Sequence, residues 1–353
     1  MKKPLYLTSL YYLKNRITGA NKRFDELGKR LIRSSDLDVY IIVQQGERPD
    51  WCDESKVIYI KAYNSKIQRL VSWLHLSWTL LRIPKGVLYS DFQPIPLFCG
   101  IKHFHYQLIH DLRNWTEFAR GGLGTLSSLF QRWQLRTAYK VVTVSEFSKD
   151  DIICKCGLLR ESIFVSYNGI TDDYTKKDGN EAVYDFIYVA TYEKRKNHLN
   201  LIKAIEKFPF DTKTCLIGRD LGSLPSIMRY IDSSSSRNLR NITFIDHIDE
   251  AELINLYQNT KIFVSPSLLE GFGMPLIESA ACGTRACCSD IEVFREIMGE
   301  SAYYFDPNNP DGIQRALQHA LSDSGQASVL SITKFRWDSI ENELRNEFLS
   351  NFS

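Results

Sequence analysis

The sequence has no long hydrophobic run: no apolar stretch among its 353 residues approaches the roughly 18 residues that cross a bilayer as a helix. The start, Met1-Lys2-Lys3-Pro4, leads into a short apolar run without a cleavage site of small residues, so no signal peptide is expected. With 44% hydrophobic and 24% charged residues, the composition is that of a globular protein. We therefore expect a cytoplasmic location and leave open only a peripheral attachment to the inner face of the cytoplasmic membrane.

Patterns for metal and cofactor binding are also missing. The eight cysteines include no C-x-x-C pair, and no histidine stands at zinc-ligand spacing from them. Most lie in apolar stretches, which favours buried thiols in a reducing compartment over disulfides. Asp36-Leu37-Asp38 has the spacing of a carboxylate metal motif, but it precedes an apolar run instead of following one, so we interpret it as a surface loop. No metal and no cofactor are expected.

The whole chain is nearly neutral, but each half carries an excess of one charge sign. The net charge is +2, yet residues 1–175 hold 25 Lys and Arg against 17 Asp and Glu, and the remainder holds 19 against 25. A basic half predicts an anionic partner, such as a diphosphate or a phospholipid surface. No nucleic-acid-binding motif accompanies it, so nucleic acid is not expected as a partner.

Short β-branched or aromatic runs alternate with segments of helical period along the chain. This alternation predicts βαβ units and parallel sheets in both halves. The polar stretch Thr171–Val183 separates the halves and has no apolar period. In the second half the strand-like runs are residues 184–190, 214–218, 241–247, 261–267, 286–290 and 303–306. The fold class is therefore α/β, with two doubly wound, Rossmann-like domains.

Two carboxylates flank a glycine-rich loop after the apolar run KIFVSPS. Glu270 lies in the loop, and Gly273 allows the backbone to approach a ligand closely. Pro275 favours the start of a helix, whose free N–H groups attract an anion. Glu278 follows about one helical turn later. Two carboxylates flanking a diphosphate site match the shape of a nucleotide sugar, whereas the simpler interpretation is a helix with surface glutamates and a glycine turn.

A basic turn follows another strand end. Lys194, Arg195 and Lys196 come after the run YDFIYVA and open a helical segment. Cations at the carboxyl end of a strand can neutralise a diphosphate leaving group, and Arg can bind it through two N–H groups. Taken alone, this turn is as well explained as a solvated basic surface.

The pattern E-G-F-G-x-P-x-x-E resembles the donor motif of retaining family-4 glycosyltransferases with the GT-B fold, the group 1 glycosyltransferases. The resemblance implies that Glu270 contacts the transferred sugar and that Glu278 contacts the ribose. It places Gly271 and Phe272 in the sugar loop and Gly273 and Met274 at the donor diphosphate. Arg195 and Lys196 match the family's R-K-N and are expected at the diphosphate too, although Ala190 replaces the usual glycine before them.

The first half carries two further matches. His110 in H-D-L corresponds to a histidine near the transferred sugar, which we name as a catalytic candidate without assigning it as a general base. Gly19 corresponds to the family's glycine loop beside the diphosphate. The resemblance also implies two domains facing across a cleft: residues 1–175 bind the acceptor, residues 176–335 bind the donor, and residues 336–353 form a terminal helix that crosses back to the first domain.

The resulting hypothesis is a retaining, metal-independent hexosyltransferase. It would move a hexose or deoxyhexose from a UDP-, GDP- or dTDP-sugar to an oligosaccharide acceptor, expected to be linked to polyprenyl diphosphate, in lipopolysaccharide O-antigen or capsule biosynthesis. In that family the leaving phosphate accepts the proton of the acceptor hydroxyl. The alternatives are a nucleotide-sugar epimerase or hydrolase of the same architecture and a non-catalytic partner subunit of a transferase.

One segment bears on membrane attachment. Residues 67–83 are apolar at helical spacing and include Trp73 and Trp78. Such a helix either faces a protein core or lies in a membrane interface, and the basic first half adds weight to the second interpretation.

Overall fold

A computed structural model describes residues 2–9, 12–14, 19–61, 66–91, 96–97, 99–112, 132–177, 182–323 and 330–352, without the side chains at 66, 67 and 69. The chain forms two compact units. Unit 1 comprises Met1–Gly169 and Phe335–Ser353, and unit 2 comprises Ile170–Lys334. Both are of the α/β class, with parallel sheets of seven and six strands.

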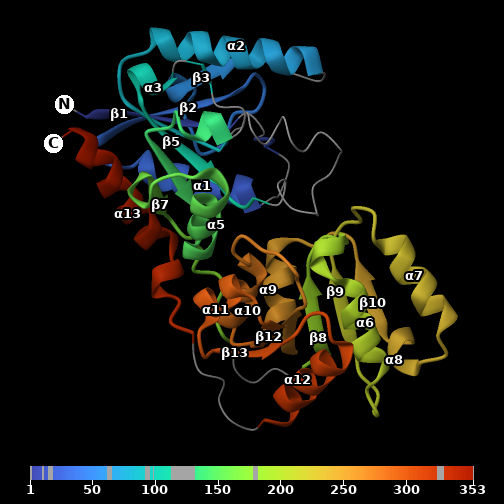
Figure 1. Cartoon of the computed structure of the whole chain (residues 1–353). Coiled ribbons are helices and arrows are strands. Elements are labelled where there is room, and N and C mark those ends of the chain that lie inside the picture. Colours follow the sequence, from blue (N-terminus) through green and yellow to red (C-terminus); the bar gives the residue numbers. More distant parts are fainter. Residues whose placement is uncertain are drawn as a thin grey trace. The chain divides into compact units, whose positions relative to one another are not determined.

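Unit 1 is built on a parallel sheet of order β3-β2-β1-β4-β5-β6-β7, with helices on both faces (Figure 1). Its strands are β1 (Lys3–Thr8), β2 (Leu37–Gln44), β3 (Val57–Ile60), β4 (Val87–Ser90), β5 (Phe104–Ile109), β6 (Lys140–Thr143) and β7 (Ile163–Val165). Its helices are α1 (Gly19–Leu31), α2 (Lys66–Arg82), α3 (Cys99–Lys102), α5 (Glu146–Cys156) and α13 (Trp337–Leu349). Leu5, Ile41 and Val87 are fully buried, as expected for parallel strands covered on two sides.

Unit 2 has the sheet order β10-β9-β8-β11-β12-β13. Its strands are β8 (Tyr184–Val189), β9 (Thr214–Ile217), β10 (Ile242–Ile245), β11 (Thr260–Ser265), β12 (Arg285–Ser289) and β13 (Ala302–Phe305). Its helices are α6 (His198–Glu206), α7 (Leu224–Ser233), α8 (Arg237–Arg240), α9 (Glu250–Gln258), α10 (Met274–Ala281), α11 (Glu292–Met298) and α12 (Pro310–Ser322).

The strand order reverses at one point in each sheet. In unit 1 the reversal lies between β1 and β4, and in unit 2 it lies between β8 and β11. At such a point the loops after the two strands diverge to opposite faces and leave a crevice at the carboxyl ends, where ligands of open α/β sheets bind.

The last helix packs within unit 1. Trp337 is buried against Gly169, where an added Cβ would lie 2.4 Å from the indole ring. Near the other end of α13, Phe348 contacts Tyr106 edge to face at 5.0 Å between ring centroids. A bulkier residue at 169 would displace Trp337, so glycine is required for this close approach.

In Asp36-Leu37-Asp38, Asp36 lies in an exposed bend, as expected for a surface loop, and β2 begins at the next residue. Leu37 and Asp38 begin β2, and the Asp38 carboxylate pairs with Lys56 at 2.6 Å. The pair lies at the amino end of these parallel strands, opposite to the carboxyl end where ligands bind.

The cysteines and the helices each have one further property. All eight cysteines are free thiols, and only Cys154 is exposed. Within the described residues, no helix is both long and apolar enough to cross a membrane.

Candidate functional site

Two loops meet at the crevice between β8 and β11 of unit 2. The first forms a 3-10 turn at Lys194–Lys196 and then turns through Asn197, which adopts a left-handed conformation at φ 57°. The Asn197 side-chain amide donates to the carbonyls of Pro266, at 3.0 Å, and Pro307, at 2.7 Å. The backbone N–H of Leu268 in the second loop donates to the carbonyl of Arg195 at 2.8 Å. These bonds hold the basic turn against the loop that carries Glu270.

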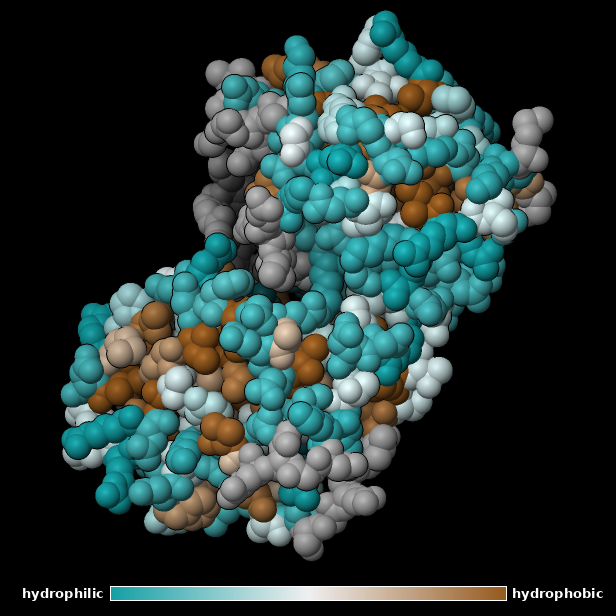
Figure 2. Space-filling view, turned by 180° about the vertical axis from the view of Figure 1, so that it is seen from behind, coloured by the Kyte–Doolittle hydropathy of each residue, from teal (hydrophilic) through white to brown (hydrophobic). Residues whose placement is uncertain are grey.

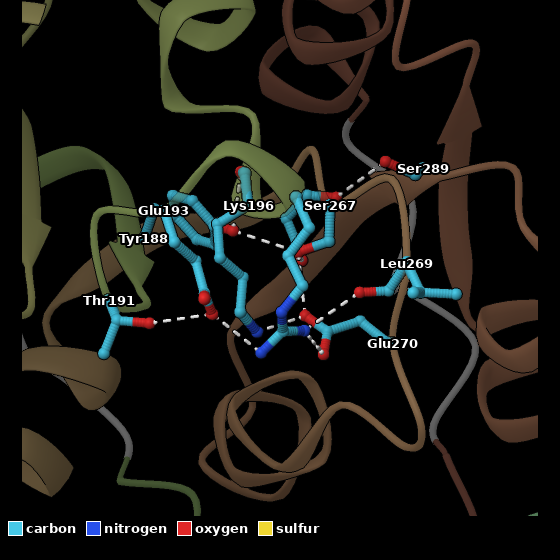
Figure 3. Close-up of polar contacts among 10 residues, drawn as sticks. Tyr188, Thr191, Glu193, Lys196, Ser267, Leu269, Glu270 and Ser289 are labelled. Carbon is cyan, nitrogen blue, oxygen red and sulfur yellow. Dashed lines mark hydrogen bonds and ion pairs between the residues drawn. The ribbon is translucent and has the colours of Figure 1, made fainter. Parts of the chain in front are cut away.

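Glu270 receives both cations of the basic turn. Its Oε2 lies 3.1 Å from Nη1 of Arg195, and its Oε1 pairs with the ammonium group of Lys196. Arg195 also donates to the carbonyl of Leu269 at 3.0 Å and pairs with Glu193 at 2.8 Å. In Figure 3 the side chains of Glu193, Lys196 and Glu270 point toward one another. The structure therefore brings Glu270 to the adjacent residues Arg195 and Lys196, which precede it in the chain by 75 and 74 positions.

The environment of this cluster favours the charged form of Glu270 and disfavours that of Lys196. Burial by itself would raise the pKa of the Glu270 carboxyl, but the positive charges of Lys196 and Arg195 bring that pKa below its ordinary value. For Lys196, burial lowers the pKa of the ammonium group, and the charge of Glu270 opposes that effect. Two cations and two carboxylates thus compensate one another in a largely buried site, where electrostatic interactions are strong.

A layer of hydroxyl and aromatic groups supports the cluster. Ser267 donates to Glu270 Oε1 at 2.8 Å, and the hydroxyl of Tyr188 hydrogen-bonds with Ser267 at 3.0 Å and donates to the carbonyl of Lys196 at 2.9 Å. The ring of His198 lies between Tyr188 and Tyr192, at 4.6 Å from each ring centroid. Burial lowers the pKa of His198 to about 3, so its imidazole is neutral at physiological pH.

The start of α10 provides the other part of the site. Gly273 adopts φ 106°, and an added Cβ would lie 2.7 Å from the ring of Phe294. The N-cap residue Gly273 has no side chain to accept from the first N–H groups of the helix, and such N–H groups are suited to bind an anion. Met274 is the first helical residue. In the loop that precedes Gly273, Gly271 and Phe272 are buried, so the Phe272 ring packs in the interior beneath the loop.

Glu278 lies one turn into α10 and is buried, with 7% of its surface exposed. Its carboxylate accepts a hydrogen bond from the Tyr257 hydroxyl at 3.4 Å. The nearby Tyr174 hydroxyl donates to Glu250 at 3.1 Å. A buried carboxylate next to two phenols can accept hydrogen bonds from a ribose diol.

The remaining two candidates belong to unit 1. His110 directly follows β5 and is partly buried. Gly19 is the exposed first residue of α1, and nothing lies within 4 Å of an added Cβ there. Both stand on the carboxyl side of the unit 1 strands. Within the described part of the chain, no group of three or more His, Cys, Asp or Glu side chains is arranged to hold a metal ion.

Four residues of the unit 2 site were missed by sequence reasoning: Glu193, Ser267, Tyr188 and His198. Glu193 stands in the same turn as Arg195, and Ser267 follows β11, so their positions after strands were a usable signal. Tyr188 lies inside a strand and resembles any core aromatic residue.

Comparison with known proteins places the sequence among transferases of sugars. Residues 171–336 match the family model described as glycosyl transferases group 1. The chain is 24% identical over 234 residues to O-antigen chain mannosyltransferase B of Escherichia coli, a match that spans 61% of each protein. It is 25% identical over 268 residues to O-antigen chain mannosyltransferase RfbU of Salmonella typhimurium, spanning 72% of each.

The fold is shared with solved structures. The Anabaena protein HepE in complex with UDP and glucose superimposes with a TM-score of 0.76 at 13% identity, over 99% of this chain and 100% of that one. The apo form of the lipopolysaccharide outer core galactosyltransferase WaaB superimposes with a TM-score of 0.74 at 16% identity, again over 99% and 100%. At these identities the likeness establishes the fold, which is GT-B.

Proposed function

We propose, from the premise that this chain is a group 1 glycosyl transferase of GT-B fold, that it moves a hexose or deoxyhexose from a nucleoside-diphosphate sugar to an oligosaccharide acceptor with retention of configuration. The observation that carries the proposal is the compensated cluster of Arg195, Lys196 and Glu270 beside the uncapped start of α10. It offers cations and free N–H groups to a diphosphate and a carboxylate to the hydroxyl groups of a sugar.

Each residue then has a role in the reaction. Arg195 and Lys196 stabilise the negative charge that grows on the leaving diphosphate as the bond between it and the anomeric carbon breaks. Glu270 accepts hydrogen bonds from the transferred sugar, and Glu278 accepts them from the ribose. The acceptor oxygen forms its bond to the anomeric carbon on the same face, and its proton goes to the departing phosphate oxygen. No protein nucleophile is required by this scheme.

The pathway proposal rests on the relatives. Two of them are named as O-antigen chain mannosyltransferases, and a structural neighbour is named as a lipopolysaccharide galactosyltransferase. We therefore favour mannose as the transferred sugar and a growing O-antigen or capsule oligosaccharide on polyprenyl diphosphate as the acceptor. The match to O-antigen chain mannosyltransferase B spans 61% of that protein, and the match to RfbU spans 72%.

Peripheral attachment to the membrane is supported by α2. One face of this helix is buried, with Leu76 and Leu80 in the core of unit 1. The opposite face exposes large apolar side chains: Leu70 at 55%, Leu74 at 47% and Trp78 at 54%. The helix contains no acidic residue. On the face drawn in Figure 2, patches of hydrophobic residues lie among hydrophilic ones. An apolar helix face without acidic residues suits an anionic bilayer surface.

The deciding experiment is a transfer assay with purified protein. UDP-, GDP- and dTDP-sugars are each incubated with and without a mannoside acceptor, and the anomeric configuration of the product is determined by NMR. Retention with acceptor-dependent turnover supports the proposal. Sugar release or isomerisation without acceptor would indicate the hydrolase or epimerase alternative. Binding without turnover would indicate a non-catalytic subunit.

The membrane proposal has a separate test. Sedimentation with phosphatidylglycerol vesicles is expected to capture the wild type, and Leu74→Asp is expected to weaken capture strongly because it places a charge in the exposed apolar face. Leu159→Asp, at an exposed position outside α2, is the matched control and is expected to sediment like the wild type. Equal capture of both variants would refute the role of α2.

A further inference from the structure

The Glu270 carboxylate is held by three side chains among the described residues. Arg195 and Lys196 pair with it, and the Ser267 hydroxyl donates to its Oε1 at 2.8 Å. Burial raises the pKa of the Glu270 carboxyl, whereas the charges of the two cations and the hydrogen bond from Ser267 oppose that effect. Each of the three groups therefore stabilises the charged form of the carboxylate.

Ser267 differs from the two cations because it cannot turn to a ligand. The residue is fully buried, and the backbone is fixed on both sides of it. On one side the Pro266 carbonyl accepts a hydrogen bond from the Asn197 side chain at 3.0 Å. On the other side the Leu268 N–H donates to the Arg195 carbonyl at 2.8 Å. The position of the Ser267 hydroxyl is thus set by the backbone of the loop and does not depend on a bound substrate.

A second hydroxyl directs the Ser267 proton toward Glu270. A carboxylate only accepts hydrogen bonds, so the contact between Ser267 and Glu270 uses the proton of Ser267. The Tyr188 hydroxyl lies 3.0 Å from the Ser267 hydroxyl (Figure 3). Burial raises the pKa of this phenol, so it keeps its proton at neutral pH. Tyr188 is therefore a donor toward Ser267, which leaves the proton of Ser267 for the carboxylate.

Donor binding changes the balance among the partners of Glu270. In the proposed reaction the two cations stabilise the charge on the leaving diphosphate, so they share or leave their contacts with the carboxylate. The unfavourable effect of burial on its charged form then persists, because burial is the largest influence on its pKa. Glu193 also faces the cluster, but it pairs with Arg195 at 2.8 Å and adds no positive charge. Ser267 is the donor that this exchange leaves in place.

We propose that Ser267 is a positioning residue for Glu270. Its hydroxyl stays on the carboxylate when Arg195 and Lys196 engage the donor diphosphate, and it keeps Glu270 charged and directed at the transferred sugar. The inference rests on the proposed function, since it assumes that a diphosphate engages the two cations. It assigns no contact with substrate to Ser267 itself.

The direct test is the titration of the Glu270 carboxyl. Its 13C NMR signal is assigned by its absence from Glu270→Gln and is followed between about pH 3 and 8, with and without saturating GDP. UDP replaces GDP in every step if calorimetry shows that UDP binds more tightly. Ser267→Ala removes the hydroxyl, and Ser267→Thr keeps it. Ser289→Ala is the matched control, because Ser289 is a fully buried serine at the end of the neighbouring strand β12 and donates to a backbone carbonyl.

Ser267→Ala is expected to raise the midpoint of this titration, because the hydrogen bond from Ser267 favours the charged carboxylate. The rise is expected to be about one pH unit or more with the nucleotide bound. It is expected to be smaller without the nucleotide, since the cations then remain on Glu270. Ser267→Thr and Ser289→Ala are expected to titrate like the wild type.

Transfer kinetics with GDP-mannose and methyl α-mannoside supply the second measurement. Ser267→Ala is expected to lower kcat at neutral pH about tenfold or more, because Glu270 is less well oriented. The KM for the donor is expected to stay within about twofold, because Ser267 does not touch it. The acid limb of the kcat profile, which reports groups in the enzyme–substrate complex, is expected to move to higher pH in the same variant.

Thermal melts of all variants separate positioning from stability. A structural role alone would lower Tm without moving the titration midpoint or the acid limb, and that result overturns the inference. Equal titration midpoints in Ser267→Ala and Ser289→Ala overturn it as well. A raised midpoint in a protein that binds the nucleotide but transfers no sugar would refute the proposed function and leave the role of Ser267 standing. A wild type that binds neither nucleotide would overturn both.

Discussion

Arg195 Nη1 lies 3.1 Å from Glu270 Oε2, so in the free protein the predicted phosphate-binding cation is already held by the predicted sugar-binding carboxylate. The side chains of both residues are about nine-tenths buried, with 8% and 11% exposed. Donor binding must therefore exchange or share these contacts, and substitutions in the cluster should separate binding from catalysis. Five predictions follow this logic or that of the surrounding loops.

Glu270→Ala is expected to lower transfer by at least about 100-fold, because the carboxylate that aligns the donor sugar is lost while the acceptor side of the site is unchanged. Nucleoside diphosphate affinity is expected to be retained or to rise, because the carboxylate that pairs with both cations is removed. Steady-state kinetics and calorimetry measure the two quantities. Glu300→Ala, at an exposed glutamate of the same unit, is the control. Near-normal turnover of Glu270→Ala would remove Glu270 from the site.

Glu193→Gln is expected to raise the affinity for the nucleotide and to lower kcat. Glu193 pairs with Arg195 at 2.8 Å, so its loss adds one net positive charge near the donor site and frees the guanidinium. Free GDP or UDP should then bind more tightly, whereas kcat should fall about tenfold because Arg195 is less well positioned. Calorimetry and donor saturation curves test this split. A parallel fall in affinity and kcat would contradict the positioning role.

Acid should selectively weaken the cluster. The folded-state pKa of Glu270 is held below its ordinary value of 4.5, so its stabilising contribution is present above that value and is lost as the pH falls through the lowered pKa. Wild type is expected to exceed Glu270→Gln in unfolding free energy by a constant amount between about pH 5 and 7. The difference should shrink below about pH 4.5. Urea unfolding of both proteins across this range measures the difference in unfolding free energy. A difference that grows toward acid pH would contradict the prediction.

Gly273→Ala is expected to damage the α10 start. The backbone there has φ 106°, and the new Cβ would lie 2.7 Å from the Phe294 ring. Left-handed strain of about 1–2 kcal/mol and overpacking of about 1–3 kcal/mol both oppose the substitution. Thermal melts should show a lower Tm, and donor affinity should fall with it. Phe294→Leu in the same background would relieve the clash and recover part of the Tm.

Transfer activity is expected to survive removal of divalent cations. The proposed scheme stabilises the leaving diphosphate with Arg195, Lys196 and the start of α10, and it assigns no step to a metal ion. Assays in excess EDTA, followed by addition of Mg²⁺ or Mn²⁺, provide the measurement. Strict dependence on an added cation would contradict this mechanism.

Much of the unit 2 site could be predicted from the sequence because its residues follow strands. Arg195, Lys196 and Glu270 stand in loops after apolar runs, and parallel strands bring such loops to one edge of the sheet. The pairing of β8 with β11 then places the two loops side by side. Gly273 and Pro275 likewise mark a helix start by local conformational preference alone.

Other features depend on contacts that no local pattern records. Glu193 in a basic turn, Ser267 after a strand and Tyr188 within one are common residue types, and only the packing of the two loops makes them partners of Glu270 and Arg195.

The sequence by itself determined the α/β alternation, the order of the strands of unit 2 along the chain and the identity of the charged groups in the loops after them. It did so because apolar periodicity and the preferences of glycine and proline act over a few residues. The tertiary structure alone decided which carboxylate meets which cation and which polar atoms stay unpaired. Those outcomes depend on strand order and burial, which bring together Lys196 and Glu270 from positions 74 residues apart. Burial lowers the pKa of Lys196, whereas the charges of Lys196 and Arg195 outweigh burial and lower the pKa of Glu270.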